Sequence, residues 1–413
     1  MAPSLRVGAS RIQVLSGSGR APFSLTLVLA AVGALAAPSP PVLADDVFLD
    51  SFEAGTFCAW SFPPTGFEVG GNGLDDNCDG AVDEAALSCD GGLPSSSSDP
   101  LQYAAAMNLC QTTTETGHDW GVVSAALTLA SGTGTPAAVS RSIRSVFGGI
   151  APRDGIAMAV LSTGAAAAPG QTNPAHTAFQ TGLDTGTSSA APADWLAANG
   201  GSFPNPPDCP EPASATASNP ILLTLRIRVP GNARSFRLSA NFLSAEFPEW
   251  VCSPYNDFVV VLLDSQFSGA PANPADKNLA VHFTPGGAVP LGVNLAFGGS
   301  DLFTQCLNGP TGCTEDAVDG TIDSCTSTAE LADSGMDVTN PPSDLGIPGW
   351  CGVSNFAGGG TGWLAVRGNV VPGENLTLRI AIWDTADGRY DSLVLLDAFQ
   401  WSLDPVEPGA VQD

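Results

Sequence analysis

The sequence predicts a mainly β protein: a β-sandwich or jelly-roll domain with long disulfide-bearing loops, preceded by a small metal-binding segment. Three observations support this class. Apolar and polar residues alternate in several short segments, the pattern of strands with one buried face. The 47 glycines and 34 prolines among 413 residues supply turns, yet they stay below the content of disordered chains. Ten cysteines are present to cross-link loops.

The clearest strand signals lie in the second half of the chain. Residues 223–229 and 236–242 alternate between apolar and polar side chains, and Pro-Gly-Asn at 230–232 is a turn signal between them. Residues 258–263 are all apolar, as expected for a central strand covered on both faces. Further strands are predicted at 156–161, 279–283, 376–383 and 392–399. Long loops are expected over 164–218 and 298–360.

The best helix signal follows a serine run at 95–98, which is itself typical of a flexible linker. Asp99 is placed to cap the first turn, and Pro100 suits the first helical position because that position needs no backbone donor. A helix is therefore predicted over the next residues, 101–109.

The chain is expected to begin with a signal peptide at 1–44. Arg6, Arg11 and Arg20 precede an apolar stretch, and small residues precede the cleavage position after Ala44. An uncleaved N-terminal anchor is the alternative. No second apolar span follows, so no membrane span is expected in the mature chain. The remaining parts are a short strand and metal-binding motif (45–92), the linker (93–98), the β domain (99–402) and a C-terminal tail (403–413).

The charge balance is strongly acidic. Three of the 14 basic residues lie in the signal region, so the mature chain carries 11 basic and 41 acidic residues, a net charge of -30. Such a chain would be repelled by phosphate backbones, which excludes a nucleic-acid partner. An acidic surface suits a secreted protein that stays soluble or gathers divalent cations.

All ten cysteines follow Ala44, an even number in a chain expected to reach an oxidising compartment. Up to five disulfides are possible, and the sequence does not fix their partners. The nearest local candidates are Cys78 with Cys89, Cys306 with Cys313, and Cys325 with Cys351. The three histidines are scattered and no Cys-x-x-Cys pair occurs, so a zinc site is not expected.

The run from Asn72 to Glu84 is the clearest candidate for a metal-binding loop in the sequence. Asp75, Asn77 and Asp79 occupy the first, third and fifth positions of a loop that turns at Gly80. The carbonyl of Ala81 and the carboxylates of Asp83 and Glu84 complete the candidate oxygen donors. The twelfth position, where an EF-hand carries glutamate, is Ala86, which excludes that motif. The alternative is a polar turn whose side chains cap their own backbone.

The spacing in this run resembles the calcium loops of thrombospondin type 3 repeats and, more closely, the repeated motif of the MopE-type metal-binding family, whose name refers to copper. The donors are oxygens with no His or Met nearby, which favours Ca²⁺ over copper. A single extracellular site of this kind is expected to bind weakly, on the order of 0.1 to 1 mM.

Four segments of the β region, 241–250, 255–257, 360–364 and 382–392, together resemble the choice-of-anchor L domain of secreted and surface-attached bacterial proteins. The resemblance covers about residues 99–402 and implies an extracellular β-rich domain.

A second candidate metal site lies within these segments. Asp384, Asp387 and Asp391 are spaced so that one loop could present them to a single cation, and Glu246 and Asp257 would complete the shell if the strands are adjacent. The alternative is that Asp387 and Gly388 form a hairpin turn and the other acids cap strand ends.

The expected function is a non-enzymatic, calcium-binding protein, secreted or at the cell surface, with a structural or adhesive role. No Gly-x-Ser-x-Gly, His-Glu-x-x-His or Cys/His catalytic signature occurs. A carboxylate pair such as Glu246 and Glu249 could serve a glycosidase, but at this spacing the two are expected to be strand-edge charges. Copper binding and polysaccharide binding are the alternative functions. The second would use an aromatic platform, whose candidates are Trp250, Tyr255, Trp350 and Trp363.

Overall fold

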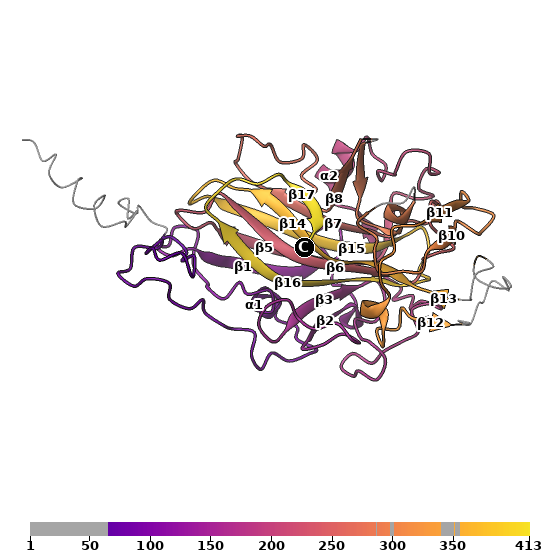
Figure 1. Ribbon diagram of the computed structural model, residues 1–413, viewed down its shortest axis with the longest axis horizontal. Coiled ribbons are helices and arrows are strands. Elements are labelled where there is room, and N and C mark those ends of the chain that lie inside the picture. Colours follow the sequence, from indigo (N-terminus) through magenta and orange to yellow (C-terminus); the bar gives the residue numbers. More distant parts are fainter. Residues whose placement is uncertain (1–64, 286, 298–300, 340–350, 352–355) are drawn as a thin grey trace, which may run out of the picture. The chain divides into compact units, whose positions relative to one another are not determined.

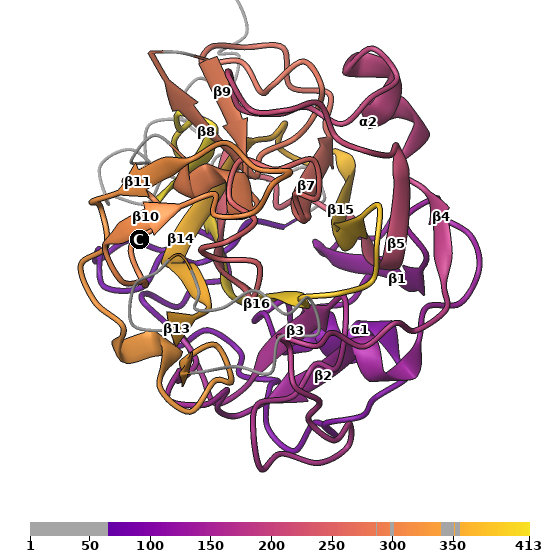
Figure 2. The same ribbon diagram turned by 90° about the vertical axis from the view of Figure 1, so that its right-hand side faces the viewer.

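Two antiparallel sheets face each other in this computed structural model, which describes residues 65–285, 287–297, 301–339, 351 and 356–413 (Figures 1 and 2). Sheet A has the strand order β1 (Gly121–Thr128), β5 (Thr216–Arg228), β15 (Asn375–Thr385), β7 (Phe258–Asp264), with β4 (Ser188–Ala190) also paired to β5. Sheet B has the order β17 (Gly409–Gln412), β14 (Gly359–Asn369), β6 (Ser235–Ser244), β16 (Ser392–Ser402), β3 (Met158–Ser162), β2 (Arg141–Arg144). The predicted β-sandwich is confirmed. The expected signal peptide and the strand within 47–60 lie outside the described residues.

Short elements fill the connections. The helices are α1 (Pro100–Ala105), α2 (Ala193–Ala198) and the 3₁₀ turns η1 (Ala138–Ser140), η2 (Val293–Ala296) and η3 (Ala329–Leu331). Three small ribbons pair β8 (Val281–Thr284) with β9 (Gly287–Pro290), β10 (Gly309–Thr311) with β11 (Gly320–Ile322), and β12 (Val338–Thr339) with β13 (Phe356–Ala357). None of the helices in the described residues is long and apolar enough to cross a membrane.

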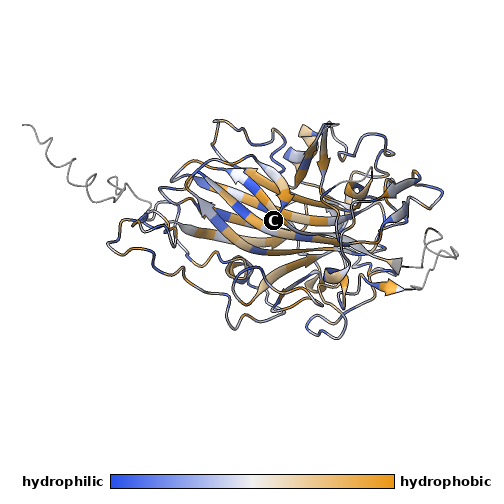
Figure 3. Ribbon diagram, viewed as in Figure 1, coloured by the Kyte–Doolittle hydropathy of each residue, from blue (hydrophilic) through white to orange (hydrophobic). Residues whose placement is uncertain are grey.

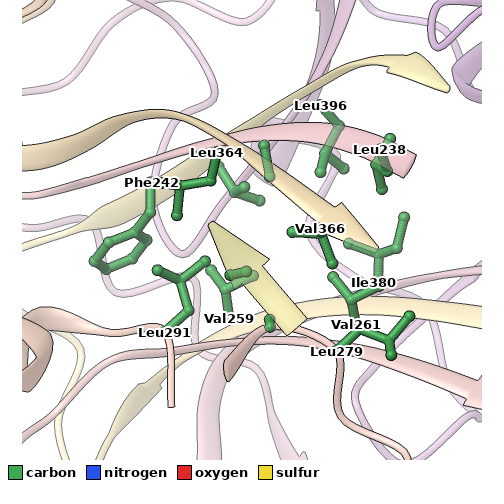
Figure 4. Close-up of a cluster of buried hydrophobic side chains, with 14 of the residues drawn as sticks. Leu238, Phe242, Val259, Val261, Leu279, Leu291, Leu364, Val366, Ile380 and Leu396 are labelled. Carbon is green, nitrogen blue, oxygen red and sulfur yellow. The ribbon is translucent and has the colours of Figure 1, made fainter. Parts of the chain in front are cut away.

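The main core lies between the sheets. Figure 4 shows Leu238, Phe242 and Leu364 of sheet B near Val259 and Ile380 of sheet A, all fully or almost fully buried. Burying a side chain of this size contributes roughly 1.5–3 kcal/mol, so this layer is the main source of the sandwich's stability. Hydropathy changes from residue to residue along several strands, as the alternating sequence predicts (Figure 3).

The two best strand predictions are confirmed, but the strands belong to different sheets. β5 pairs with β1 and β15, whereas β6 pairs with β14 and β16. The Pro-Gly-Asn turn at 230–232 therefore carries the chain from one sheet to the other. Within β6, Ser239 and Asn241 are also buried because loops cover the outer face of sheet B.

The all-apolar strand β7 is buried on both faces, as predicted, but it is the last strand of sheet A and not a central one. One face joins the main core, and the other packs with Trp195 and Phe203 on the outer side of sheet A. Its outer edge is also covered, because the backbone of 277–291 hydrogen-bonds to Val259, Val261 and Leu263. The continuous apolar run reflects this double cover.

Helix α1 begins as predicted and ends early. Asp99 is the N-cap, its Oδ1 accepts from Leu101 N at 3.0 Å, and Pro100 is the first residue. The helix ends at Ala105, short of the predicted 109, and Asn108 adopts a left-handed φ of 68°. The preceding serine run is packed, since Ile143 N donates to Ser95 O.

Replacing Asp99 with Ala is expected to lower the free energy of unfolding by about 1 kcal/mol, because the first turn of α1 loses its capping oxygen. The midpoint of urea unfolding measures this loss. The variant Glu407→Gln, at an exposed position, provides the baseline. An unchanged midpoint in Asp99→Ala would show that the cap contributes nothing.

The disulfides differ from the local candidates. The described bridges are Cys89–Cys110, Cys209–Cys252, Cys306–Cys325 and Cys313–Cys351, and Cys78 is also disulfide-bonded. The pairs Cys78 with Cys89, Cys306 with Cys313, and Cys325 with Cys351 are therefore wrong. Proximity in sequence fails here because the loop 301–325 folds back through the β10–β11 ribbon.

Candidate metal centre

Four predicted acids meet at one end of the sandwich, where chain segments pass between the sheets. Glu246 follows β6, Asp257 precedes β7, Asp384 lies near the end of β15, and Asp391 precedes β16. Antiparallel pairing brings them together, since Ser244 is opposite Ser392 in sheet B and Phe258 is opposite Trp383 in sheet A. We refer to Glu246, Asp257, Asp384 and Asp391 as the acidic centre. The adjacency that the sequence hypothesis required is present.

Hydrogen bonds link the four segments. Asp257 N donates to Glu246 Oε2 at 3.3 Å, and Ser392 Oγ lies 2.6 Å from Asp257 Oδ2. Asn219 Nδ2 donates to Asp384 Oδ2 at 2.8 Å. The centre therefore joins both sheets.

Within the described residues, two oxygens of the acidic centre have no hydrogen-bond partner. Asp384 Oδ1 and Asp391 Oδ2 are buried without a hydrogen bond, although Asp391 Oδ1 accepts from Leu183 N at 2.9 Å. A buried oxygen without a donor costs free energy unless a proton or a cation satisfies it. Gly164 faces the same point, because a Cβ there would overlap with Asp391 Oδ2.

Burial sets the electrostatics of the centre, whose four residues are between 0% and 2% exposed. Desolvation raises the pKa of Glu246, Asp257 and Asp384 well above the ordinary range, and the neighbouring carboxylates add to each rise. Desolvation also raises the pKa of Asp391 to about 7. None of the four forms an ion pair with a described basic residue. Compensation must come from protons or a bound cation.

Asp387 lies at the border of this centre. Its carboxylate accepts from Arg389 N at 3.1 Å, which makes a local turn, but no hairpin forms because β15 belongs to sheet A and β16 to sheet B. Burial raises its pKa while Arg389 opposes the rise, and its charge acts on Glu246 and Asp257. Asp387 is thus both a turn residue and a neighbour of the acidic centre.

Segment 179–187 covers the centre, and sequence reasoning missed it. Asp391 N donates to Phe179 O, and Thr185 donates to Asn219 Oδ1 through its N at 2.9 Å and its Oγ1 at 2.6 Å. Gly182 has φ 67°, and a Cβ there would lie 2.6 Å from Arg389 Cα. A glycine allows this close approach. No periodic signal marks such a covering loop.

The front loop is held by its own oxygens. Asp75 accepts from Asp79 N at 3.2 Å and Gly80 N at 3.0 Å, and Asp79 accepts from Ala81 N. Asp83 accepts from Asn72 N at 2.9 Å. Asn77 donates to Glu84.

Glu68, which the sequence hypothesis missed, accepts from the backbone amides of Asp76, Asn77 and Asp83. This is the geometry of the polar-turn alternative, with Asp75 buried and Asp79 and Asp83 exposed.

Asn232 fixes the front loop to the sandwich. Its Oδ1 accepts from Phe67 N at 2.9 Å, and its Nδ2 donates to Asp76 O at 3.0 Å. Asn232 belongs to the turn between β5 and β6, at the end of those strands away from Ser218 and Ser244. The two candidate sites are thus separate.

In the part of the chain that the structure describes, no three His, Cys, Asp or Glu side chains have the spacing of a preassembled metal centre. This does not decide about calcium, because Ca²⁺ takes six to eight oxygens and uses amide, backbone and water oxygens beside carboxylates. The hydroxyl of Thr163 lies beside Asp384 as such an oxygen donor, whereas Asn219 faces Asp384 with its amide nitrogen.

The other candidate residues are largely inside the protein. Glu249 is 2% exposed with both carboxylate oxygens unpaired, and burial raises its pKa to about 9. Trp363 is 8% exposed and packs in the outer cluster of sheet B. Trp250 and Tyr255 are half-buried against each other, with ring centroids 5.3 Å apart. Trp350 lies outside the described residues.

The fold and the centre define a disulfide-bonded β-sandwich protein with a buried acidic cluster between its sheets. Comparisons with protein-family models, curated proteins and solved structures give no match. The likenesses to MopE-type motifs and to the choice-of-anchor L domain therefore stay predictions from the motifs.

The calcium-free protein is expected to lose stability as pH rises. The acids of the centre have pKa values near 4 when unfolded and higher ones when folded, about 7 for Asp391. Between these values the native state binds more protons, so the free energy of unfolding falls from about pH 4 through about pH 7. Urea unfolding in EDTA at pH 5 and pH 8 measures the fall.

Asp397, whose pKa is raised to about 6, contributes in the same direction. The double variant Asp384→Asn/Asp391→Asn retains Asp397. The difference between its pH dependence of stability and that of the natural protein therefore measures the contribution of Asp384 and Asp391. An equal pH slope in the variant and the natural protein would contradict the assignment.

Proposed function

We propose that this chain is a secreted or cell-surface protein whose β-sandwich is stabilised by Ca²⁺ at the acidic centre, with a structural or adhesive role and no enzymatic activity. The observation that carries the proposal is the burial of Glu246, Asp257, Asp384 and Asp391 together, without an ion pair to any described basic residue. A divalent cation would neutralise charge that burial otherwise penalises. The disulfides accord with an oxidising compartment.

The donor chemistry favours calcium among the metals. Carboxylate, amide and hydroxyl oxygens are hard ligands, which suit Ca²⁺ and not copper. At the front loop the one soft donor, Cys78, is already in a disulfide. The loop oxygens of Asp75, Asn77 and Asp79 would provide a second, weaker and less buried calcium site.

Polysaccharide binding has less support as an alternative. Stacking on a sugar needs an exposed ring face, and Trp363 offers almost none. The pair Trp250 and Tyr255 is half-buried and would supply only a small platform.

Thermal unfolding of the purified protein tests the proposal. Compared with refolding from urea in EDTA, refolding in Ca²⁺ at about 100 times Kd is expected to add about 2.7 kcal/mol to the free energy of unfolding by mass action. Mg²⁺ and Cu²⁺ at equal concentration should add less. Identical melting curves with Ca²⁺ and with EDTA would overturn the proposed function.

A further inference from the structure

The acidic centre is almost completely buried, and this has a kinetic consequence for a bound ion. Its four acids are between 0% and 2% exposed. The unpaired oxygens Asp384 Oδ1 and Asp391 Oδ2 mark where an ion would be held. An ion bound to these oxygens would lie among buried groups, so we expect its exit to require movement of the surrounding segments.

Segment 179–187 provides one wall of this enclosure and is fixed at both ends. Gln180 Nε2 donates to Gly335 O at 2.8 Å, and Asn219 N donates to Thr187 O at 2.9 Å. Between these anchors, Leu183 N binds Asp391 and Thr185 binds Asn219. With Phe179 O, which accepts from Asp391 N, three residues of the segment contact a member of the centre or the side-chain amide of Asn219, which donates to Asp384.

We propose that calcium at the acidic centre is taken up during folding and is then trapped beneath segment 179–187, which acts as a fixed cover. This rests on the proposed function and concerns how the ion enters and leaves. Release requires local unfolding of the cover, an event that is much slower than dissociation from an exposed loop. The ion is a folding cofactor and does not report changes in external calcium.

The release of ⁴⁵Ca²⁺ into excess chelator tests the proposal. The measurement uses the full chain carrying Asp75→Asn and Asp79→Asn, so that an ion at the front loop does not contribute. The expected result is one ion per chain that leaves with a half-time of minutes or longer. Complete release within seconds, with one ion bound at the start, would overturn the trap and leave the proposed function intact. Absence of bound calcium at the start would overturn both.

Two variants test whether segment 179–187 limits the rate at which calcium is released. Gly182→Ala places a Cβ 2.6 Å from Arg389 Cα and should speed release at least tenfold while one ion still binds. Thr185→Val is milder, removes one hydrogen bond to Asn219, and should speed release several-fold. As a matched control, Thr133→Val replaces an exposed threonine outside segment 179–187 and should leave the rate unchanged. Equal release rates in Thr185→Val and the control would contradict the role of the cover.

Discussion

Replacing Asp384 and Asp391 together with Asn is expected to abolish the stabilisation by calcium. Both side chains keep their size, so Asn219 and Leu183 retain a neighbour of the same shape. Two of the four buried charges disappear, and with them the attraction for a divalent ion. In the natural protein, calcium at about 1,000 times Kd should raise the free energy of unfolding by about 4 kcal/mol, which corresponds to a rise of several degrees in Tm. In the double variant, the same calcium concentration should leave the free energy of unfolding almost unchanged.

The same variant should be at least as stable as the natural protein in EDTA at pH 8. Buried carboxylates that repel one another destabilise the calcium-free fold, and two neutral amides remove part of that repulsion. The double variant is therefore expected to lose the stabilisation by calcium and yet to be no less stable than the natural protein without calcium. Glu407→Gln, an acid-to-amide change at an exposed position, should alter neither the stabilisation by calcium nor the stability in EDTA. An undiminished calcium response in the double variant would place the ion elsewhere.

Replacing Trp195 with Ala is expected to destabilise the sandwich by about 3–5 kcal/mol. Trp195 is fully buried on the outer face of sheet A. Its ring lies 5.9 Å from Phe203, 6.2 Å from Phe258 and 5.6 Å from Trp383, measured between centroids. Truncation leaves a cavity that these rigid rings cannot fill.

Urea unfolding of Trp195→Ala and Trp195→Phe measures the effect. The Phe variant keeps an aromatic ring and should lose less than half as much. A loss below about 1 kcal/mol in the Ala variant would show that α2 and its neighbours add little to the fold, since exposed positions change stability by about 0.5 kcal/mol.

The sequence predicted the strands better than their neighbours. Alternation in 223–229 shows which face of β5 is buried, because side chains alternate across a strand, but it does not show which strand lies beside it. β14 was missed as a strand because Gly359, Gly360 and Gly362 interrupt its pattern. Its glycines are needed, since a Cβ at Gly360 would lie 2.5 Å from Leu243 Cδ2.

The acidic centre was predictable in its acids but not in its surroundings. Asp384, Asp387 and Asp391 share one loop, so their spacing suggested a common site. Asn219 and segment 179–187 come from distant parts of the chain and carry no local pattern. The disulfide partners were also beyond reach, because a pairing depends on how loops return in space.

A crystal structure of the protein grown in calcium tests the central claim most directly. We expect an anomalous density peak among Glu246, Asp257, Asp384 and Asp391, with carboxylate oxygens about 2.3–2.6 Å away. Protonated carboxyl groups hydrogen-bonded to one another, with no peak between them, would show that the centre holds protons in place of calcium and would contradict the account.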